Sequence, residues 1–107
     1  MIRIVFNHLP GGAITGVAVD GHAGGEYGQD IVCAAVSALV QTVYLSLTEL
    51  RHRTVRWEAR AGHALLMLPE ASWNDEQDQL LMNTLWVGLE SIRLGEPKKV
   101  HIAVKEV

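Results

Sequence analysis

The sequence predicts an α+β, two-layer domain in which two helices cover a mainly antiparallel sheet. Short segments with apolar residues at alternate positions recur along the chain and are typical of strands, and two longer segments carry helix signals. The 107 residues are 49% hydrophobic and 20% charged, which is the balance of an ordinary globular domain. We expect the element order β-β-α-β-β-α-β within one domain over residues 1–107.

The chain is expected to begin with a β-hairpin. Ile2, Ile4 and Phe6 are separated by single residues, which is the two-residue period of a strand. Pro-Gly-Gly at 10–12 then breaks the chain, and Ile14–Gly21 alternates again. The short connection favours pairing of the two segments as a hairpin.

A loop and a first helix should follow. The glycine-rich residues 22–29 favour neither helix nor strand, whereas Asp30 suits the N-cap of a helix over Ile31–Leu50. No residue from Ile31 to Thr48 is charged, so this helix is apolar almost all round. Its interspersed polar and alanine residues argue against a membrane span. Burial on two sides, by the sheet and by a partner subunit, is the simpler interpretation.

Two more strands are expected in the middle of the chain. Residues 54–60 alternate between apolar and charged side chains, and residues 61–63 read as a turn. Ala64–Leu68 is short and wholly apolar, which favours a central strand, and Pro69 ends it.

The second helix is expected after the segment Ser72-Trp73-Asn74-Asp75, which resembles a capping box with Ser72 as the cap. Gly95 followed by Pro97 is a common helix stop. The intervening residues carry one apolar stripe at spacings of three and four, formed by Leu81, Leu85, Leu89 and Ile92. A final strand is expected around Val100, Ile102 and Val104.

Charge and cysteine content narrow the function classes. Twelve acidic against nine basic residues give a net charge of −3, which argues against a nucleic-acid partner. The single cysteine, Cys33, excludes an intrachain disulfide and fits a reducing compartment. The first residues lack a signal-peptide pattern, so we expect a cytoplasmic protein. The histidines are scattered without ligand spacing, so no metal site is expected.

Cys33 is the residue whose position suggests chemistry. With Asp30 as the N-cap, Cys33 lies third in the helix, near free backbone N–H groups and the positive end of the dipole. Both favour a thiolate and would make the thiol more acidic than in free cysteine, whereas the charge of Asp30 opposes this, so the sequence does not give the sign of the sum. His22 ends the preceding strand, and the loop can return it to the helix start. A cysteine and a histidine in contact are the minimal unit of thiol catalysis.

Each of these residues also has a purely structural interpretation. A lone cysteine in an apolar helix is most often a core residue, and a histidine beside glycines is usually a loop residue. Asp30 either orients the histidine or only caps the helix. Ser37, one turn after Cys33, either lines the site or bonds a backbone carbonyl. Gly24 and Gly25 belong either to a substrate lid or merely to a loop.

The segments Gly21-His22-Ala23, Glu26-Tyr27-Gly28 and Asp-Ile-Val-Cys-Ala-Ala-Val-Ser at 30–37 resemble the signature of the ribosomal-processing cysteine protease Prp family, also called YsxB-like. The rest of the chain agrees in length and element order. The resemblance implies a single Prp-like cysteine protease domain over residues 1–107.

What the resemblance implies for the site is specific to residues. The nucleophile falls on Cys33 and the general acid and base on His22, with supporting roles for Asp30 and Ser37. No metal or cofactor is implied. The glycine-rich loop implies substrate binding by four residues, Gly21, Ala23, Gly24 and Gly25.

The resemblance further implies a small cytosolic homodimer that removes a short N-terminal extension from a large-subunit ribosomal protein, number twenty-seven. Cleavage would follow an aromatic residue. An extended, apolar peptide can add along a sheet edge with its side chains in a pocket, and an acidic protein attracts a basic ribosomal segment modestly. Two alternatives remain: a non-catalytic dimeric module that binds a ribosomal or assembly partner, and a redox-sensing thiol.

Overall fold

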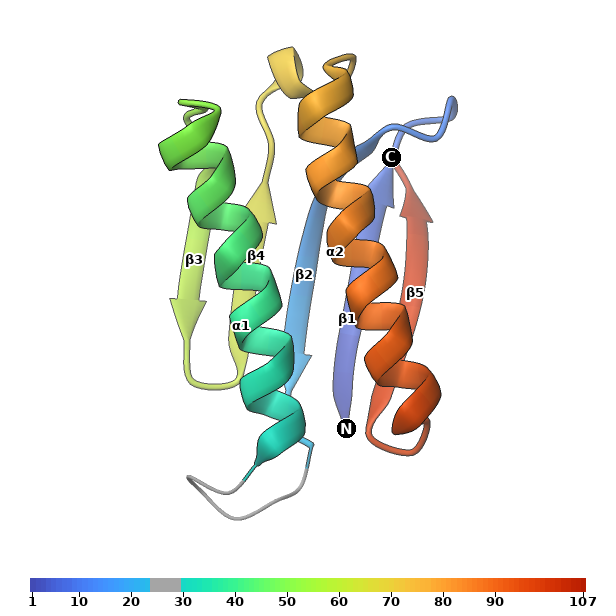
Figure 1. The fold of residues 1–107 in the computed structure, drawn as a ribbon. Coiled ribbons are helices and arrows are strands. Elements are labelled where there is room, and N and C mark those ends of the chain that lie inside the picture. The colour runs from blue at the N-terminus through green and yellow to red at the C-terminus, as the bar shows by residue number, and fades with distance from the viewer. Residues whose placement is uncertain (24–29) are drawn as a thin grey trace.

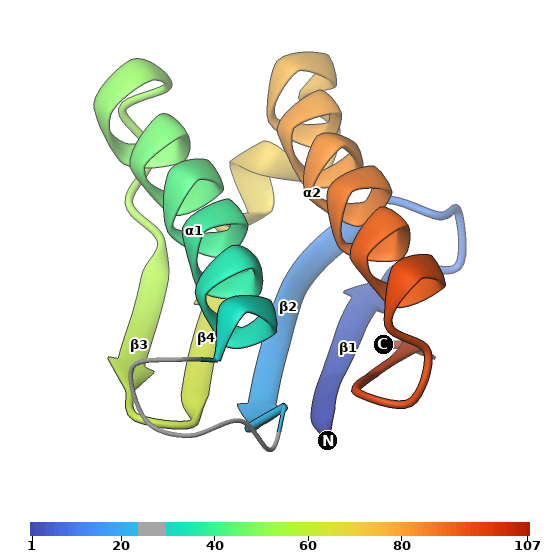
Figure 2. The ribbon, with the colours of Figure 1, turned by 60° about the horizontal axis from the view of Figure 1, so that its bottom comes forward.

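The computed structural model describes residues 1–23 and 30–107 and shows one five-stranded sheet with two α-helices on the same face (Figure 1, Figure 2). All neighbouring strands are antiparallel except β1 and β5, which are parallel. The expected α+β fold with a mainly antiparallel sheet is therefore confirmed. The sheet order is β3-β4-β2-β1-β5, from β1 (Ile2–His8), β2 (Ile14–Gly21), β3 (Arg56–Arg60), β4 (His63–Met67) and β5 (Val100–Glu106).

The strands differ from the expected ranges only at their ends. β1 continues to His8, where a bulge marks the hairpin, and β3 begins at Arg56 rather than at residue 54. His63, expected in the turn, is the first residue of β4 because it already pairs with Asp20 of β2. β4 lies between β3 and β2, so the expected central position of this apolar strand is confirmed.

The first helix also follows the expectation. α1 (Ile31–Leu45) continues as a π-helical turn, η1 (Ser46–Leu50), whose wider bonding is seen in the bond from the Arg51 N–H to the Ser46 carbonyl. By length and composition alone, Ile31–Leu50 is long enough to cross a membrane, with a mean hydropathy of 1.8. One side of this helix packs in the core of the domain, where four of its valines are buried: Val32, Val36, Val40 and Val43.

The core lies between the helices and the sheet. α1 lies on the β3–β4 side and α2 (Glu76–Gly95) on the β1–β5 side (Figure 1). In β1 the alternate residues Ile2, Ile4 and Phe6 face the helices and are buried, as the two-residue period predicts, whereas the first four residues of β2 are all buried. The edge of the Trp86 ring meets Phe6, with centroids 4.9 Å apart. The other buried apolar side chains include Ile2, Ile4, Val17, Leu66, Met82, Leu85 and Leu89.

The expected capping box at Ser72 is wrong. The chain first makes a tight turn after Pro69, η2 (Glu70–Ser72), in which Ser72 is buried. This turn moves the N-cap of α2 three residues along, to Asp75, whose Oδ1 accepts the N–H of Asp78 at 2.8 Å. An aspartate fills the cap position as well as a serine does.

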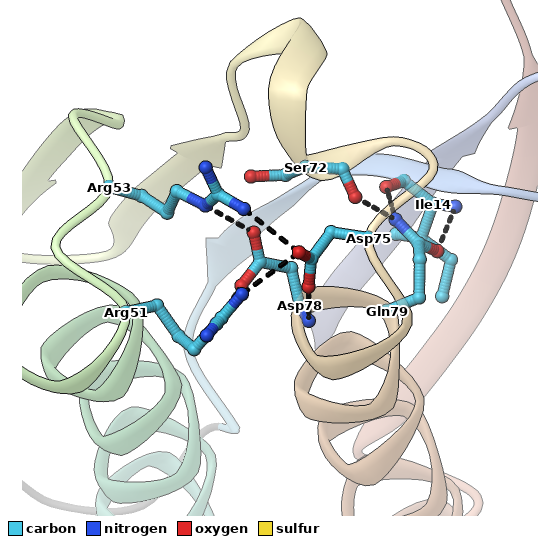
Figure 3. Close-up of polar contacts among 7 residues, drawn as sticks. All are labelled: Ile14, Arg51, Arg53, Ser72, Asp75, Asp78 and Gln79. Carbon is cyan, nitrogen blue, oxygen red and sulfur yellow. Dashed lines mark hydrogen bonds and ion pairs between the residues drawn. The ribbon is translucent and has the colours of Figure 1, made fainter.

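A buried ionic cluster joins the end of the first helix to the start of the second (Figure 3). Arg51 Nε donates to Asp78 Oδ1 at 2.8 Å, and Arg53 Nε donates to Asp78 Oδ2 at 2.6 Å. Both guanidinium groups also donate to Asp75 Oδ2, at 2.9 and 3.0 Å. The N–H of Asp78 and the two arginines hold the pKa of the Asp75 carboxyl below its usual range. The cluster therefore fixes the two helices to each other far from Cys33.

Candidate active site

The end of β2 and the start of α1 meet at one edge of the sheet (Figure 1). Gly21 has a positive φ of +100°, and a Cβ there would collide with the Met1 carbonyl, so glycine is required where the chain turns. The N–H of Ala23 then donates to Asp30 Oδ2 at 3.1 Å and to Cys33 Sγ at 3.3 Å. The expected return of the strand end to the helix start is confirmed.

Cys33 has the predicted position, third in its helix. Asp30 is the N-cap of α1, and its Oδ1 accepts the Cys33 N–H at 2.9 Å. Burial raises the pKa of the Cys33 thiol, and a hydrogen bond to the Asp30 carboxylate adds to this. The N–H of Ala23 lowers the pKa but does not outweigh them. The structure therefore gives a sign to the balance that the sequence left open: burial and the capping carboxylate favour S–H over the thiolate.

His22 lies in the same cleft as Cys33 without bonding to it. Its ring rests on the β3–β4 turn, where a Cβ on Gly62 would lie 2.7 Å from Nε2. The Gly62 carbonyl in turn accepts the N–H of Gly21 at 2.9 Å. Within the described part of the chain, no hydrogen bond joins the imidazole to the thiol. The structure therefore brings the two side chains to one cleft without a direct hydrogen bond between them.

Of the other predicted site residues, the structure describes Ser37, Gly21 and Ala23. Ser37 is exposed and lines the cleft, and its hydroxyl bonds no backbone carbonyl in residues 1–23 and 30–107, which favours the site interpretation. Gly21 also lines the cleft, and Ala23 contributes its N–H. Gly24 and Gly25 lie outside the described residues.

The cleft itself has a volume of about 660 Å³, within the range of ligand sites. Besides the predicted residues, the β3–β4 turn forms one wall, with Arg60, Gly62 and His63. Nδ1 of His63 lies 2.6 Å from Asp20 Oδ1 and ties β4 to β2 beside His22. The sequence marked residues 61–63 as a turn, but nothing in it indicated that this turn supports the histidine.

A half-buried thiol in the first turn of a helix, facing one cleft with an imidazole, defines a thiol-dependent hydrolase on a small α+β domain. In residues 1–23 and 30–107, no three His, Cys, Asp or Glu side chains gather as a metal site requires. The family model described as cysteine protease Prp matches residues 1–101. The chain belongs to the cysteine protease Prp family and is a cysteine protease.

Known relatives agree in sequence and in fold. The ribosomal processing cysteine protease Prp of Staphylococcus aureus (strain NCTC 8325) is 35% identical over 98 residues, covering 88% of this chain and 90% of that protein. The crystal structure of Prp from S. aureus with a covalently linked product peptide has a TM-score of 0.90 at 29% identity, covering 98% of this chain and 100% of that one. SMU.848 from Streptococcus mutans has a TM-score of 0.87 at 32% identity, covering 100% and 99%.

Proposed function

We propose that the protein removes a short N-terminal extension from large-subunit ribosomal protein twenty-seven by cutting after an aromatic residue, with Cys33 as nucleophile and His22 as general acid and base. The observation that carries the proposal is the placement of both side chains in one cleft of about 660 Å³. A crystal structure of S. aureus Prp in complex with a substrate peptide, at TM-score 0.86 and 28% identity, supports a peptide as the occupant.

The chemistry begins with transfer of the thiol proton to the imidazole. The His22 ring leaves Gly62 and reaches the sulfur, and the thiolate attacks the carbonyl carbon of the residue before the cut. The N–H of Ala23, already 3.3 Å from Sγ, lies within reach of the developing oxyanion. The imidazolium gives the proton to the leaving amine, which departs with the shortened ribosomal protein, and water then attacks the thioester to release the cleaved extension and regenerate the Cys33 thiol.

Asp30 and Ser37 take supporting roles in this proposal. Asp30 holds the thiol and the Ala23 N–H in place and keeps the sulfur protonated until the imidazole arrives. Ser37 stands one turn further along α1, on the same side of the cleft. Gly21, Ala23, Gly24 and Gly25 are proposed to contact the peptide.

The raised pKa of Cys33 keeps the resting thiol protonated, so the proposed mechanism depends on the imidazole reaching the sulfur. Iodoacetamide labelling tests this step, because the labelling rate of Cys33 should rise when an uncleavable peptide brings the imidazole to the sulfur. A labelling rate that the peptide leaves unchanged would contradict the proposed role of His22. The alternative of a non-catalytic binding module does not hold, because the chain belongs to a family of cysteine proteases.

We also propose that the protein acts in the cytoplasm as a homodimer, as a single domain over residues 1–107. The outward side of α1 supports the dimer, because it is uncharged and exposes Ile31 by 82% and Leu45 by 50%. Sedimentation equilibrium measures the oligomeric state of the wild type, which should be a dimer, and of Ile31→Asp, which should be a monomer. A wild-type monomer at micromolar concentration would contradict the dimer.

The test of the protease is incubation with a synthetic peptide that carries the extension, followed by mass spectrometry. Cys33→Ala and Cys33→Ser are expected to reduce kcat by about 10³-fold or more, because the nucleophile is lost. The kcat of His22→Ala is expected to fall by a similar factor. The control is His101→Ala, an exposed histidine on β5, which should cleave at the wild-type rate.

Circular dichroism and the unfolding midpoint establish that each variant is folded. Turnover by folded Cys33→Ala at the wild-type rate would overturn the proposed nucleophile. An intact peptide after incubation with wild-type protein would overturn the proposed substrate.

A further inference from the structure

We infer that Asp20 and His63 together position the general acid and base, His22, by holding the β3–β4 turn against the end of β2. This inference rests on the proposed function, in which the imidazole of His22 moves the proton. The role of the pair is to position a catalytic group, and neither residue acts on the peptide itself.

The pair lies where the β2–β4 ladder ends and the His22 segment begins. Asp20 and His63 are the last paired residues of the two strands. One residue further along β2, the N–H of Gly21 donates to the Gly62 carbonyl at 2.9 Å. The next residue is His22, whose Nε2 lies 2.7 Å from the place that a Cβ on Gly62 would take. The position of Gly62 therefore sets both the backbone and the ring of His22.

The side-chain bond lies on the face of the sheet that is turned away from the helices. Val19 packs against the core, so its neighbour Asp20 points to the opposite face, as does the partner residue His63. Nδ1 of His63 lies 2.6 Å from Asp20 Oδ1. An ionised carboxylate can only accept a hydrogen bond, so the imidazole donates from Nδ1 in both of its charge states. The bond between β2 and β4 is therefore kept whether or not His63 is protonated.

The turn needs such a bond because it lies at a free corner of the sheet. β3 is an edge strand, and Ala61, at the tip of the turn, is exposed. The end of a ladder at an edge opens more easily than its middle. The side chains of Asp20 and His63 are 60% and 18% exposed, and a partly exposed pair contributes little to overall stability. The effect of the pair is expected on the position of the turn, and hence on His22.

The test compares two substitutions of His63. His63→Ala removes the Nδ1 donor, whereas the side-chain amide of His63→Asn can donate from nearly the same place. We expect kcat for the extended peptide to fall about tenfold in His63→Ala, with KM within about twofold of wild type, since the peptide still binds and only the imidazole is misplaced. The kcat of His63→Asn should stay within about threefold of wild type, because the bond to Asp20 is restored.

A double-mutant cycle tests whether the two residues act through one bond. Asp20→Ala, a change at an exposed side chain, should lower kcat as much as His63→Ala does. The kcat of the double variant Asp20→Ala/His63→Ala should fall no further than that of either single variant, because the bond can be lost only once. The control is His101→Ala, an exposed histidine in the same row of the sheet on β5, which should retain the wild-type kcat.

Cysteine labelling separates a misplaced imidazole from a damaged site. Without peptide, iodoacetamide should label Cys33 in His63→Ala at the wild-type rate, because the contacts of Cys33 with Asp30 and Ala23 are untouched. With an uncleavable peptide, the rise in labelling that His22 brings about should be smaller than in wild type. Circular dichroism and the unfolding midpoint establish that each variant is folded.

The outcomes separate this inference from the proposed function. If wild type cleaves the peptide and folded His63→Ala and Asp20→Ala keep its kcat, the inference fails while the proposed function stands. Additive losses in the double variant would also overturn the inference, because the two residues would then act separately. A wild-type protein that leaves the peptide whole would overturn the proposed function, and the positioning role would fall with it.

Discussion

Asp30 and Asp75 cap the two helices of this protein in the same way and differ in their other partners. Asp30 accepts the N–H of Cys33, and Asp75 accepts the N–H of Asp78, in each case from the third residue of the helix. The remaining oxygen of Asp30 receives the Ala23 N–H, and the carboxylate also bonds the thiol. The remaining oxygen of Asp75 receives two guanidinium groups.

The difference shows how one capping residue serves either stability or chemistry. At Asp75 the N–H of Asp78 and the charges of the two arginines lower the pKa of the carboxyl, and the arginines fix the helix ends. At Asp30 the carboxylate acts on a titratable neighbour and adds to burial in raising the pKa of Cys33. Asp75, which bonds two arginines, therefore belongs to an ionic cluster that stabilises the fold, here called the ionic cluster. Asp30, which bonds a thiol, instead changes the protonation of Cys33.

Disrupting the ionic cluster should give the largest loss of folding stability. Asp78 is fully buried and accepts from both arginines, so Asp78→Ala leaves the two cations with Asp75 as the one carboxylate bonded to them. We expect a loss of about 3 kcal/mol in the free energy of unfolding, measured by urea denaturation. Glu76→Ala, an exposed carboxylate in the same helical turn, is the control and should cost well under this.

The rate at which iodoacetamide labels Cys33 in folded Asp78→Ala should remain at the wild-type value. A changed labelling rate would show that the two caps are coupled, and would remove the contrast between them.

Displacing the His22 ring should slow catalysis strongly without removing a catalytic group. Gly62→Ala places a Cβ 2.7 Å from His22 Nε2, and the ring, as the end of a flexible side chain, is the part that moves. We expect kcat for the extended peptide to fall about 10²-fold with a smaller change in KM. Gly12→Ala is the matched control, since Gly12 also has positive φ but nothing within 4 Å of the added Cβ.

An alanine at positive φ strains the backbone similarly in both variants, so their urea unfolding midpoints should fall by similar amounts. Equal cleavage rates for the two variants would mean that the place of the His22 ring is irrelevant to turnover.

Neutralising the catalytic cap should give a smaller effect that tests the sign of the thiol shift. Asp30→Asn keeps an oxygen to accept the Cys33 N–H but removes the charge that raises the pKa of the thiol. The pKa of Cys33, read from iodoacetamide labelling against pH, should therefore fall, and labelling at pH 7.5 should become several-fold faster. Asp75→Asn makes the same change at the other cap and should leave the labelling profile unchanged.

Slower labelling in Asp30→Asn would reverse the assignment, since the carboxylate would then be accepting the thiol proton as a base. The stability of Asp30→Asn should stay within about 0.5 kcal/mol of wild type, because asparagine and aspartate cap equally well.

Much of the fold could be predicted because its signals are local. The two-residue periods of β1 and β2 and the cap at Asp30 depend only on neighbours in the chain, and each was found in place. The prediction of a cap at Ser72 was wrong because Ser72 and Asp75, three residues apart, can both accept the first N–H groups of a helix. The turn after Pro69 and the two arginines that follow the first helix select Asp75.

Taken alone, the sequence determined the order of elements, the third place of Cys33 in its helix and the family to which the chain belongs. Strand periods, capping residues and a contiguous motif are all written within a few residues of one another. Tertiary structure alone decided the support of His22 by Gly62 and the sign of the thiol's pKa shift. Each of these depends on which segments pair across the sheet, and therefore on distances between residues far apart in the chain.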